Sequence, residues 1–263
     1  MTTRRNDVLV GALGADLQPR YEPNFAWKSA VAVNLALGSL RGCWPLSSAD
    51  NTGAALDVSG QARTLTYKGN PLYTADGLRW YLAFDGTGDH LSRADEAGLD
   101  IIGTETYVAA PGLTLGCWVR FGGAAAAVEH VLGKWLAAGN QRSYALVRTA
   151  AGLGCFQMSN AGAAIDGTIS STAVMAATAW YFLAGRFVPS TSVDVWVNDE
   201  QSTNAVAIPA AICNSTADFR ISGTGAATNL LTGDVCLAWL CAAALPDVVV
   251  WSVFQQQRAL FGV

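Results

Sequence analysis

Aspartates that follow a predicted strand are the first side chains in this sequence that could do chemistry. Asp85 ends the apolar run 82–84, and Gly86-Thr87-Gly88 connects it to Asp89. Calcium is bound by several carboxylate and carbonyl oxygens from flexible loops, so Asp85 and Asp89 are candidate calcium ligands. The alternative is a turn in which the Asp85 carboxylate caps nearby backbone amides. The absence of a dense ligand run such as DxDxD favours the turn. Other candidate oxygen ligands in this part of the chain are Asp50, Asn51 and Asp57.

Aromatic side chains are the second group with chemical potential. A sugar site stacks flat rings on the apolar faces of pyranose units and adds a few polar groups for orientation. Trp135, Tyr144 and Trp196 are the candidate ligand-binding residues of this kind. Buried aromatic rings with a satisfied polar atom, and rings in subunit contacts, give the same pattern and are commoner.

Catalytic patterns are weak by comparison. The chain has two histidines, His90 and His130, and no GxSxG motif that would mark a serine nucleophile. Glycoside hydrolysis needs a pair of carboxylates about 5–9 Å apart. No glutamate has a second acid two residues away on the same face of a strand, and we expect no enzymatic activity.

Alternation of apolar and polar residues predicts the elements that position these side chains. In residues 113–121 the alternate positions are Leu, Leu, Cys, Val and Phe, whereas Trp118 falls on the other face with polar residues. Residues 193–198 repeat the pattern, with valines on one face and Trp196 on the other. A period of two over six or more residues indicates strands.

About ten short strands without intervening helices predict an all-β fold, a two-sheet antiparallel jelly-roll sandwich. Leu245-Pro246-Asp247 is a plausible helix start and predicts one short helix that closes the domain. The further predicted strands are residues 65–67, 81–84, 131–135, 144–148, 154–158, 180–187, 219–222 and 233–242.

Composition points to contacts with other molecules. Hydrophobic residues make up 51% of the 263 residues and charged residues only 14%, against a usual value of about 25% charged. We therefore expect the apolar sheet faces to meet other subunits, in a homo-oligomer or a larger assembly. A net charge of −4 argues against binding to nucleic acid. No apolar run reaches the roughly 20 residues of a membrane span.

Six cysteines are present, none in a CxxC pair and none with a histidine nearby. Most lie in apolar runs, as in Gly116-Cys117-Trp118, which favours reduced core thiols over disulfides and over a zinc site.

The first 40 residues differ from the rest of the chain. Prolines at 19 and 23 favour extended backbone, and we interpret residues 1–40 as an arm that packs against a neighbour or against its own domain; a loosely ordered tail is the alternative. The run 8–15 is a poor secretory signal, because it is short, follows Asp7 and contains two glycines.

The order of motifs in residues 41–263 resembles the concanavalin A-like, laminin G-like jelly-roll family. The motifs that carry the resemblance are Cys43-Trp44-Pro45-Leu46, Ala55-Leu56-Asp57-Val58-Ser59-Gly60, Phe84-Asp85-Gly86 with Asp89, residues 114–119, Val131-Leu132-Gly133-Lys134-Trp135, residues 180–187, Val195-Trp196-Val197-Asn198 and Ala244-Leu245-Pro246-Asp247. The resemblance implies a module that binds carbohydrate or protein, often with calcium and usually outside cells.

Modules of this kind with a short N-terminal arm and no signal peptide resemble structural proteins of tailed-phage virions. The first functional hypothesis is therefore a non-enzymatic virion decoration protein that assembles with itself or with other virion subunits. The alternative is a carbohydrate-binding or adhesion module of a bacterial extracellular or surface protein, which would bind surface glycans. One fold hosts many functions, so the fold alone does not choose between them.

Overall fold

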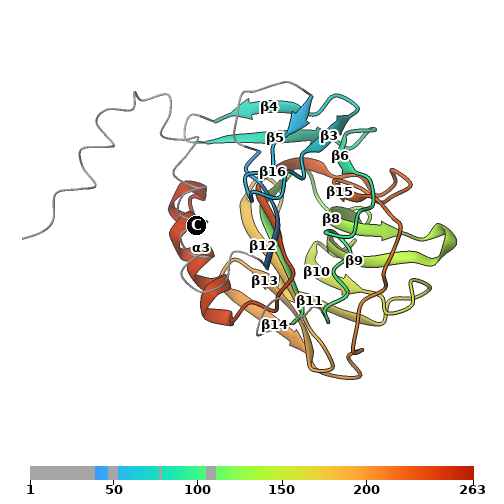
Figure 1. Ribbon diagram of the computed structural model, residues 1–263. Coiled ribbons are helices and arrows are strands. Elements are labelled where there is room, and N and C mark those ends of the chain that lie inside the picture. Colours follow the sequence, from blue (N-terminus) through green and yellow to red (C-terminus); the bar gives the residue numbers. More distant parts are fainter. Residues whose placement is uncertain (1–38, 47–52, 77–78, 105–110) are drawn as a thin grey trace, which may run out of the picture.

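The computed structural model describes residues 39–46, 53–76, 79–104 and 111–263. These residues form two packed eight-stranded sheets and one α-helix, α3 (Asp247–Phe261). Figure 1 shows α3 on one side of the sandwich, the first sheet in the middle and the second sheet on the opposite side. The predicted all-β, two-sheet antiparallel sandwich is confirmed. Residues 1–38, most of the predicted arm, lie outside the described residues, and Leu40 is already the first residue of a strand.

The first sheet has the order β14-β13-β12-β7-β16-β5-β4, and β1 pairs with the second half of β16. Its strands are β1 (Leu40–Trp44), β4 (Leu72–Ala75), β5 (Trp80–Asp85), β7 (Leu113–Phe121), β12 (Trp180–Val188), β13 (Ser192–Val197), β14 (Glu200–Asn204) and β16 (Thr232–Cys241).

The second sheet has the order β11-β10-β9-β8-β15-β6-β3-β2. Its strands are β2 (Ala54–Ala55), β3 (Leu65–Lys68), β6 (His90–Arg93), β8 (Glu129–Leu136), β9 (Gln141–Arg148), β10 (Leu153–Met158), β11 (Gly167–Val174) and β15 (Phe219–Ile221). A single 3₁₀ turn, η2 (Ala138–Asn140), joins β8 to β9.

The main core lies between the sheets and follows the predicted alternation. In β7, the alternate residues from Leu113 to Phe121 point into it and are fully buried. Trp118 and Trp196 point to the opposite face of the first sheet, as predicted. That face is covered by α3 of the same chain: Trp118 stacks on Phe261 at a centroid distance of 3.9 Å. The apolar outer face of the first sheet is therefore largely occupied within the molecule.

All six cysteines are free thiols, and only Cys213 is partly exposed. Burial raises the pKa of Cys236 and of Cys241 to about 12, so both remain protonated at neutral pH. Within the described residues, no helix is long and apolar enough to cross a membrane.

Candidate functional site

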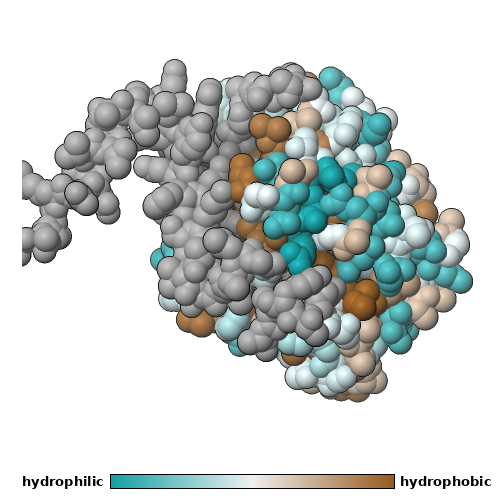
Figure 2. All heavy atoms as spheres, in the orientation of Figure 1, coloured by the Kyte–Doolittle hydropathy of each residue, from teal (hydrophilic) through white to brown (hydrophobic). Residues whose placement is uncertain are grey.

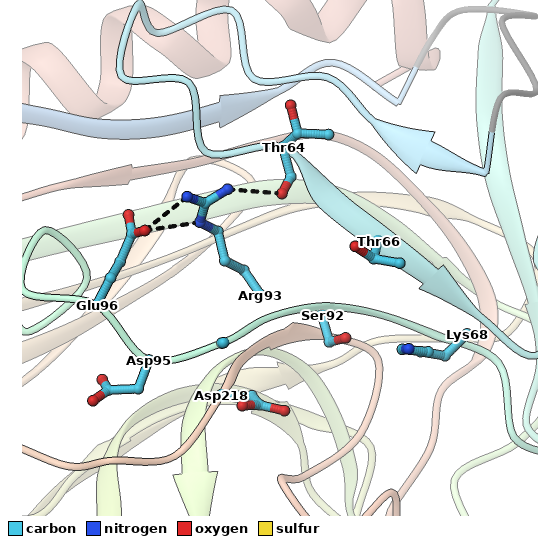
Figure 3. Close-up of a pocket in the computed structure, with 9 residues that line it drawn as sticks. Thr64, Thr66, Lys68, Ser92, Arg93, Asp95, Glu96 and Asp218 are labelled. Atoms are coloured by element: carbon cyan, nitrogen blue, oxygen red, sulfur yellow. Dashed lines mark hydrogen bonds and ion pairs between the residues drawn. The ribbon is translucent and has the colours of Figure 1, made fainter.

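A polar groove lies on the second sheet, where β3 and β6 meet the loop after β6 (Figure 3). Its volume is about 470 Å³. Figure 2 shows hydrophilic residues gathered over the middle of this side of the molecule, where Figure 1 places β6 and β15. The lining residues are Thr64, Thr66, Lys68, Ser92, Arg93, Ala94, Asp95, Glu96 and Asp218.

Strand register explains why hydroxyl groups line the groove. Leu65 and Leu91 point into the core, so Thr66 and Ser92, their neighbours along β3 and β6, point outward. Thr66 and Ser92 are directly paired across the two strands. Ser92 is in turn paired with Arg220 of β15, which lies on its other side. One polar row therefore crosses three strands that are distant in sequence.

Glu96 is fixed at one end of the groove by two arginines. Arg93 donates to its Oε2 from Nε at 3.0 Å and from Nη2 at 2.7 Å, and Arg63 donates to Oε1. Arg93 also donates to the Thr64 carbonyl at 3.2 Å. Burial alone would raise the pKa of Glu96, but the hydrogen bonds from Arg93 and Arg63 outweigh it and lower that pKa. Glu96 is therefore a fixed anion, an acceptor that cannot supply a proton at neutral pH.

The remaining charges give the groove both donors and acceptors. Lys68 is exposed, and Figure 3 shows its side chain directed toward Ser92. Asp218 lies 3.5 Å from Arg220 in a loose ion pair, which leaves carboxylate oxygen free to accept further hydrogen bonds. No aromatic ring is among the nine lining residues. The groove can therefore recognise a ligand with many hydroxyl groups by hydrogen bonding, without a stacking platform.

The three aromatic candidates lie in separate parts of the molecule. Tyr144 is fully buried in the main core, and its hydroxyl donates to the Leu99 carbonyl at 2.9 Å. Trp196 is 3% exposed beside α3, beneath the Arg186 guanidinium. Trp135 is 7% exposed, in a small cluster on the second sheet. None presents a free ring face, so their role in sugar binding stays a prediction. Stacking on a sugar would require the residues that cover these rings to move away.

Asp85 and Asp89 have the contacts of a capped turn. Asp85 is exposed and accepts from the Thr87 amide at 2.6 Å. Asp89 is buried, and its two oxygens accept from the Asn70 amide at 2.6 Å and from the Asp85 amide at 3.3 Å. Gly69, at φ +74°, packs so closely that a Cβ there would lie 2.3 Å from the Asp89 carboxylate. No group of three or more histidine, cysteine, aspartate or glutamate side chains is placed to hold a metal among the described residues.

Sequence reasoning missed the groove residues. The alternation of Thr64, Thr66 and Lys68 with Leu65 and Tyr67 is the signal that marks an outward polar face on β3. The partner strands β6 and β15 are distant in sequence, and only the observed register brings Ser92 and Arg220 to the same face. Asp50 and Asn51 lie outside the described residues.

The fold is shared with binding domains of clostridial toxins. The binding domain of Paraclostridial Mosquitocidal Protein 1 superposes with a TM-score of 0.63 at 10% identity, over 83% of this chain and 52% of that one. A structure of botulinum neurotoxin type C, whose cell entry is dependent upon interaction with two ganglioside molecules, superposes with a TM-score of 0.63 at 11% identity, over 85% of this chain and 52% of that one. The binding domain of botulinum neurotoxin DC in complex with rat synaptotagmin II superposes with a TM-score of 0.61 at 11% identity, over 85% of this chain and 52% of that one.

These values show a common β-sandwich fold. The chain spans about half the length of the solved structures it matches. No protein-family model matches the sequence, and no curated protein is similar to it. None of the similar structures named here is a virion protein, so the virion role stays a prediction without support from them.

Proposed function

We propose that this domain binds glycans through the groove on the second sheet and has no catalytic role. The observation that carries the proposal is the row of outward hydroxyl groups with Lys68 and Asp218 beside it, in a groove of about 470 Å³. Sites for small ligands commonly have volumes of about 300–1,000 Å³ and a few convergent polar groups. The similarity in fold to a toxin binding domain, and to a structure of a neurotoxin whose cell entry is dependent upon interaction with two ganglioside molecules, supports the same function class.

Binding rather than hydrolysis agrees with the state of Glu96 in the groove. A general acid for glycoside hydrolysis needs a raised pKa. The two arginines lower the pKa of Glu96, which suits it to accept hydrogen bonds from ligand hydroxyls. A glycan-binding domain of this kind acts on the outside of cells, on the surface of a bacterium or of a target cell.

A glycan array with the full chain tests the proposal, and calorimetry on the best ligand gives the dissociation constant. Thr66 is exposed on β3, so Thr66→Trp would fill the groove and weaken binding at least tenfold. Lys68→Ala would weaken it severalfold. Thr172→Trp is the matched control, because Thr172 is an exposed threonine on β11, near the opposite edge of the same sheet.

Two results would contradict the proposal. Absence of binding to every neutral and acidic glycan would overturn glycan recognition itself. Binding that survives Thr66→Trp would leave a glycan-binding domain whose site is not this groove.

A further inference from the structure

Lys134 points into the sandwich with no exposed side-chain surface, which is unusual for a lysine. The register of β8 places it between Phe219 of β15 and Tyr144 of β9, both fully buried. Its Nζ lies 2.5 Å from Oδ1 of Asp95 and 2.5 Å from Oδ1 of Asp100. An amine and two carboxyl groups therefore meet at the edge of the core, next to the groove that Asp95 lines.

Asp100 is the better enclosed of the two carboxyl groups. Its side chain is 17% exposed, against 31% for Asp95. The Tyr144 hydroxyl holds the preceding residue by donating to the Leu99 carbonyl. With its nitrogen turned toward Asp100, the Asn214 amide donates to both carboxylate oxygens, at 3.1 and 3.2 Å. Burial raises the pKa of Asp100 and Asp95 raises it further, against the opposing effect of Lys134.

We propose that Lys134 and Asp100 form an intramolecular isopeptide bond, with Asp95 as the acid–base group. Asp95 first takes a proton from the Lys134 ammonium. The neutral Nζ then attacks Cγ of Asp100, which lies one covalent bond beyond the oxygen that it already contacts.

The reaction is a condensation that needs no co-reactant. The Nζ–Cγ bond forms, one Cγ–O bond of Asp100 breaks, and that oxygen leaves as water. Its two protons come from Nζ and are carried in turn by Asp95, which ends ionised as it began. Because Asp95 lines the groove, the water has a route to solvent.

An ordinary ion pair is the competing interpretation of the same contacts. An ion pair keeps the buried ammonium, whose desolvation is costly, whereas condensation removes both its charge and that of Asp100. The bond would also link β8 covalently to the segment after β6. The two interpretations differ by one molecule of water in the mass of the protein.

Mass spectrometry of the full chain after denaturation tests the proposal directly. We expect a mass one water lower than that of the sequence. Trypsin cleaves after Arg93, Arg120 and Arg142, so the bond would join peptides 94–120 and 121–142, with Lys134 uncut. A linear 94–142 peptide has the same mass, but the branched product has two α-amino groups, and fragmentation places the bond at Lys134 and Asp100.

Variants separate the reaction from the fold. Lys68→Arg, a control at an exposed lysine, should have a mass one water molecule below that calculated from its sequence. Lys134→Arg and Asp95→Ala should have the full masses calculated from their sequences. A wild-type chain of full mass with unmodified Lys134 would overturn the proposal, whether or not any variant folds. A bonded Asp95→Ala protein would overturn the role of Asp95. Neither result depends on glycan binding.

Discussion

The Asp85–Asp89 turn shows how a single buried carboxylate can stabilise a loop. Asp89→Ala would leave the amides of Asn70 and Asp85 without their acceptor, so we expect it to lower the free energy of unfolding, by about 1–3 kcal/mol. Asp85→Ala, at an exposed position with one local bond, should change it by less than about 0.5 kcal/mol. Urea unfolding measures both changes.

The same experiment, repeated with calcium and with a chelator, tests the candidate calcium site. The backbone amides already occupy the Asp89 oxygens, so we expect the same unfolding free energy in both buffers. A stabilisation that rises with calcium concentration and disappears in Asp85→Ala would show instead that the turn binds the ion.

His130 makes stability depend on pH. Burial lowers its pKa to about 4, from an unfolded value of about 6.5. Below the unfolded pKa the unfolded chain takes up a proton that the folded chain rejects, so stability falls as pH decreases from about 6.5 to about 4. Between about pH 6.5 and about pH 5 the loss from this residue would be about 1.6 kcal/mol.

Urea unfolding of wild type and His130→Gln at both pH values isolates that contribution. The pH-dependent loss should be smaller in His130→Gln by about this amount. His90→Gln is the control, since burial also lowers the pKa of His90 but that residue is less enclosed. An identical pH dependence in wild type and His130→Gln would refute the assignment.

Side-chain direction could be predicted from the sequence, but side-chain surroundings could not. The predicted direction of the Trp118 and Trp196 side chains is confirmed, because the alternation of side chains along a strand is a local property of the backbone. What covers them depends on where α3 packs, and what surrounds Trp135 and Tyr144 depends on the register of other strands. Alternation within one strand therefore does not show whether an aromatic ring is exposed, and all three candidate rings are buried.

At the scale of elements, α3 is the cover of the first sheet. Phe261 stacks on Trp118 and meets Trp180 edge-on at 5.1 Å, so Phe261→Ala would open a cavity between helix and sheet. We expect a loss of about 3–5 kcal/mol in unfolding free energy. Trp251→Ala is the matched control on the same helix: Trp251 is 50% exposed, and we expect a change within about 0.5 kcal/mol.

Thermal and urea unfolding of both helix variants provide the measurement. Equal losses in the two variants would mean that the helix contributes mainly through its own stability and not through packing on Trp118.

Strands with a clear alternating pattern were predicted close to their observed bounds, as for β7, β12 and β13. The expected C-terminal helix is confirmed, and α3 is longer than the short helix that the sequence predicts. The polar strands β11 and β14 and the short β4 and β6 were not predicted from alternation. Such strands lie at or near sheet edges or depend on their partners, so their own residues carry little periodic apolar signal.

At the scale of the molecule, the two sheets have different outer faces. The first sheet meets α3, whereas the second presents a polar groove toward solvent. A domain with one closed and one open face is suited to binding through the open face. The sequence predicted the sandwich but not this difference, because it arises from the packing of a helix that follows the last strand.

The boundary between arm and sandwich gives the last prediction. Deletion of residues 1–38 should leave a folded domain, because β1 pairs with β16 and the Ala242 amide donates to the Ser39 carbonyl at 2.7 Å. Deletion of residues 1–44 should unfold it, because it also removes Trp44, a fully buried ring that stacks on Phe219 at 4.9 Å. Circular dichroism and thermal unfolding distinguish the two truncations.

Sedimentation of the protein that lacks residues 1–38, compared with the full chain, tests whether the arm mediates assembly, as its sequence suggests. Assembly that is unchanged without residues 1–38 would exclude that role, and a stable fold without residues 1–44 would show that β1 is dispensable.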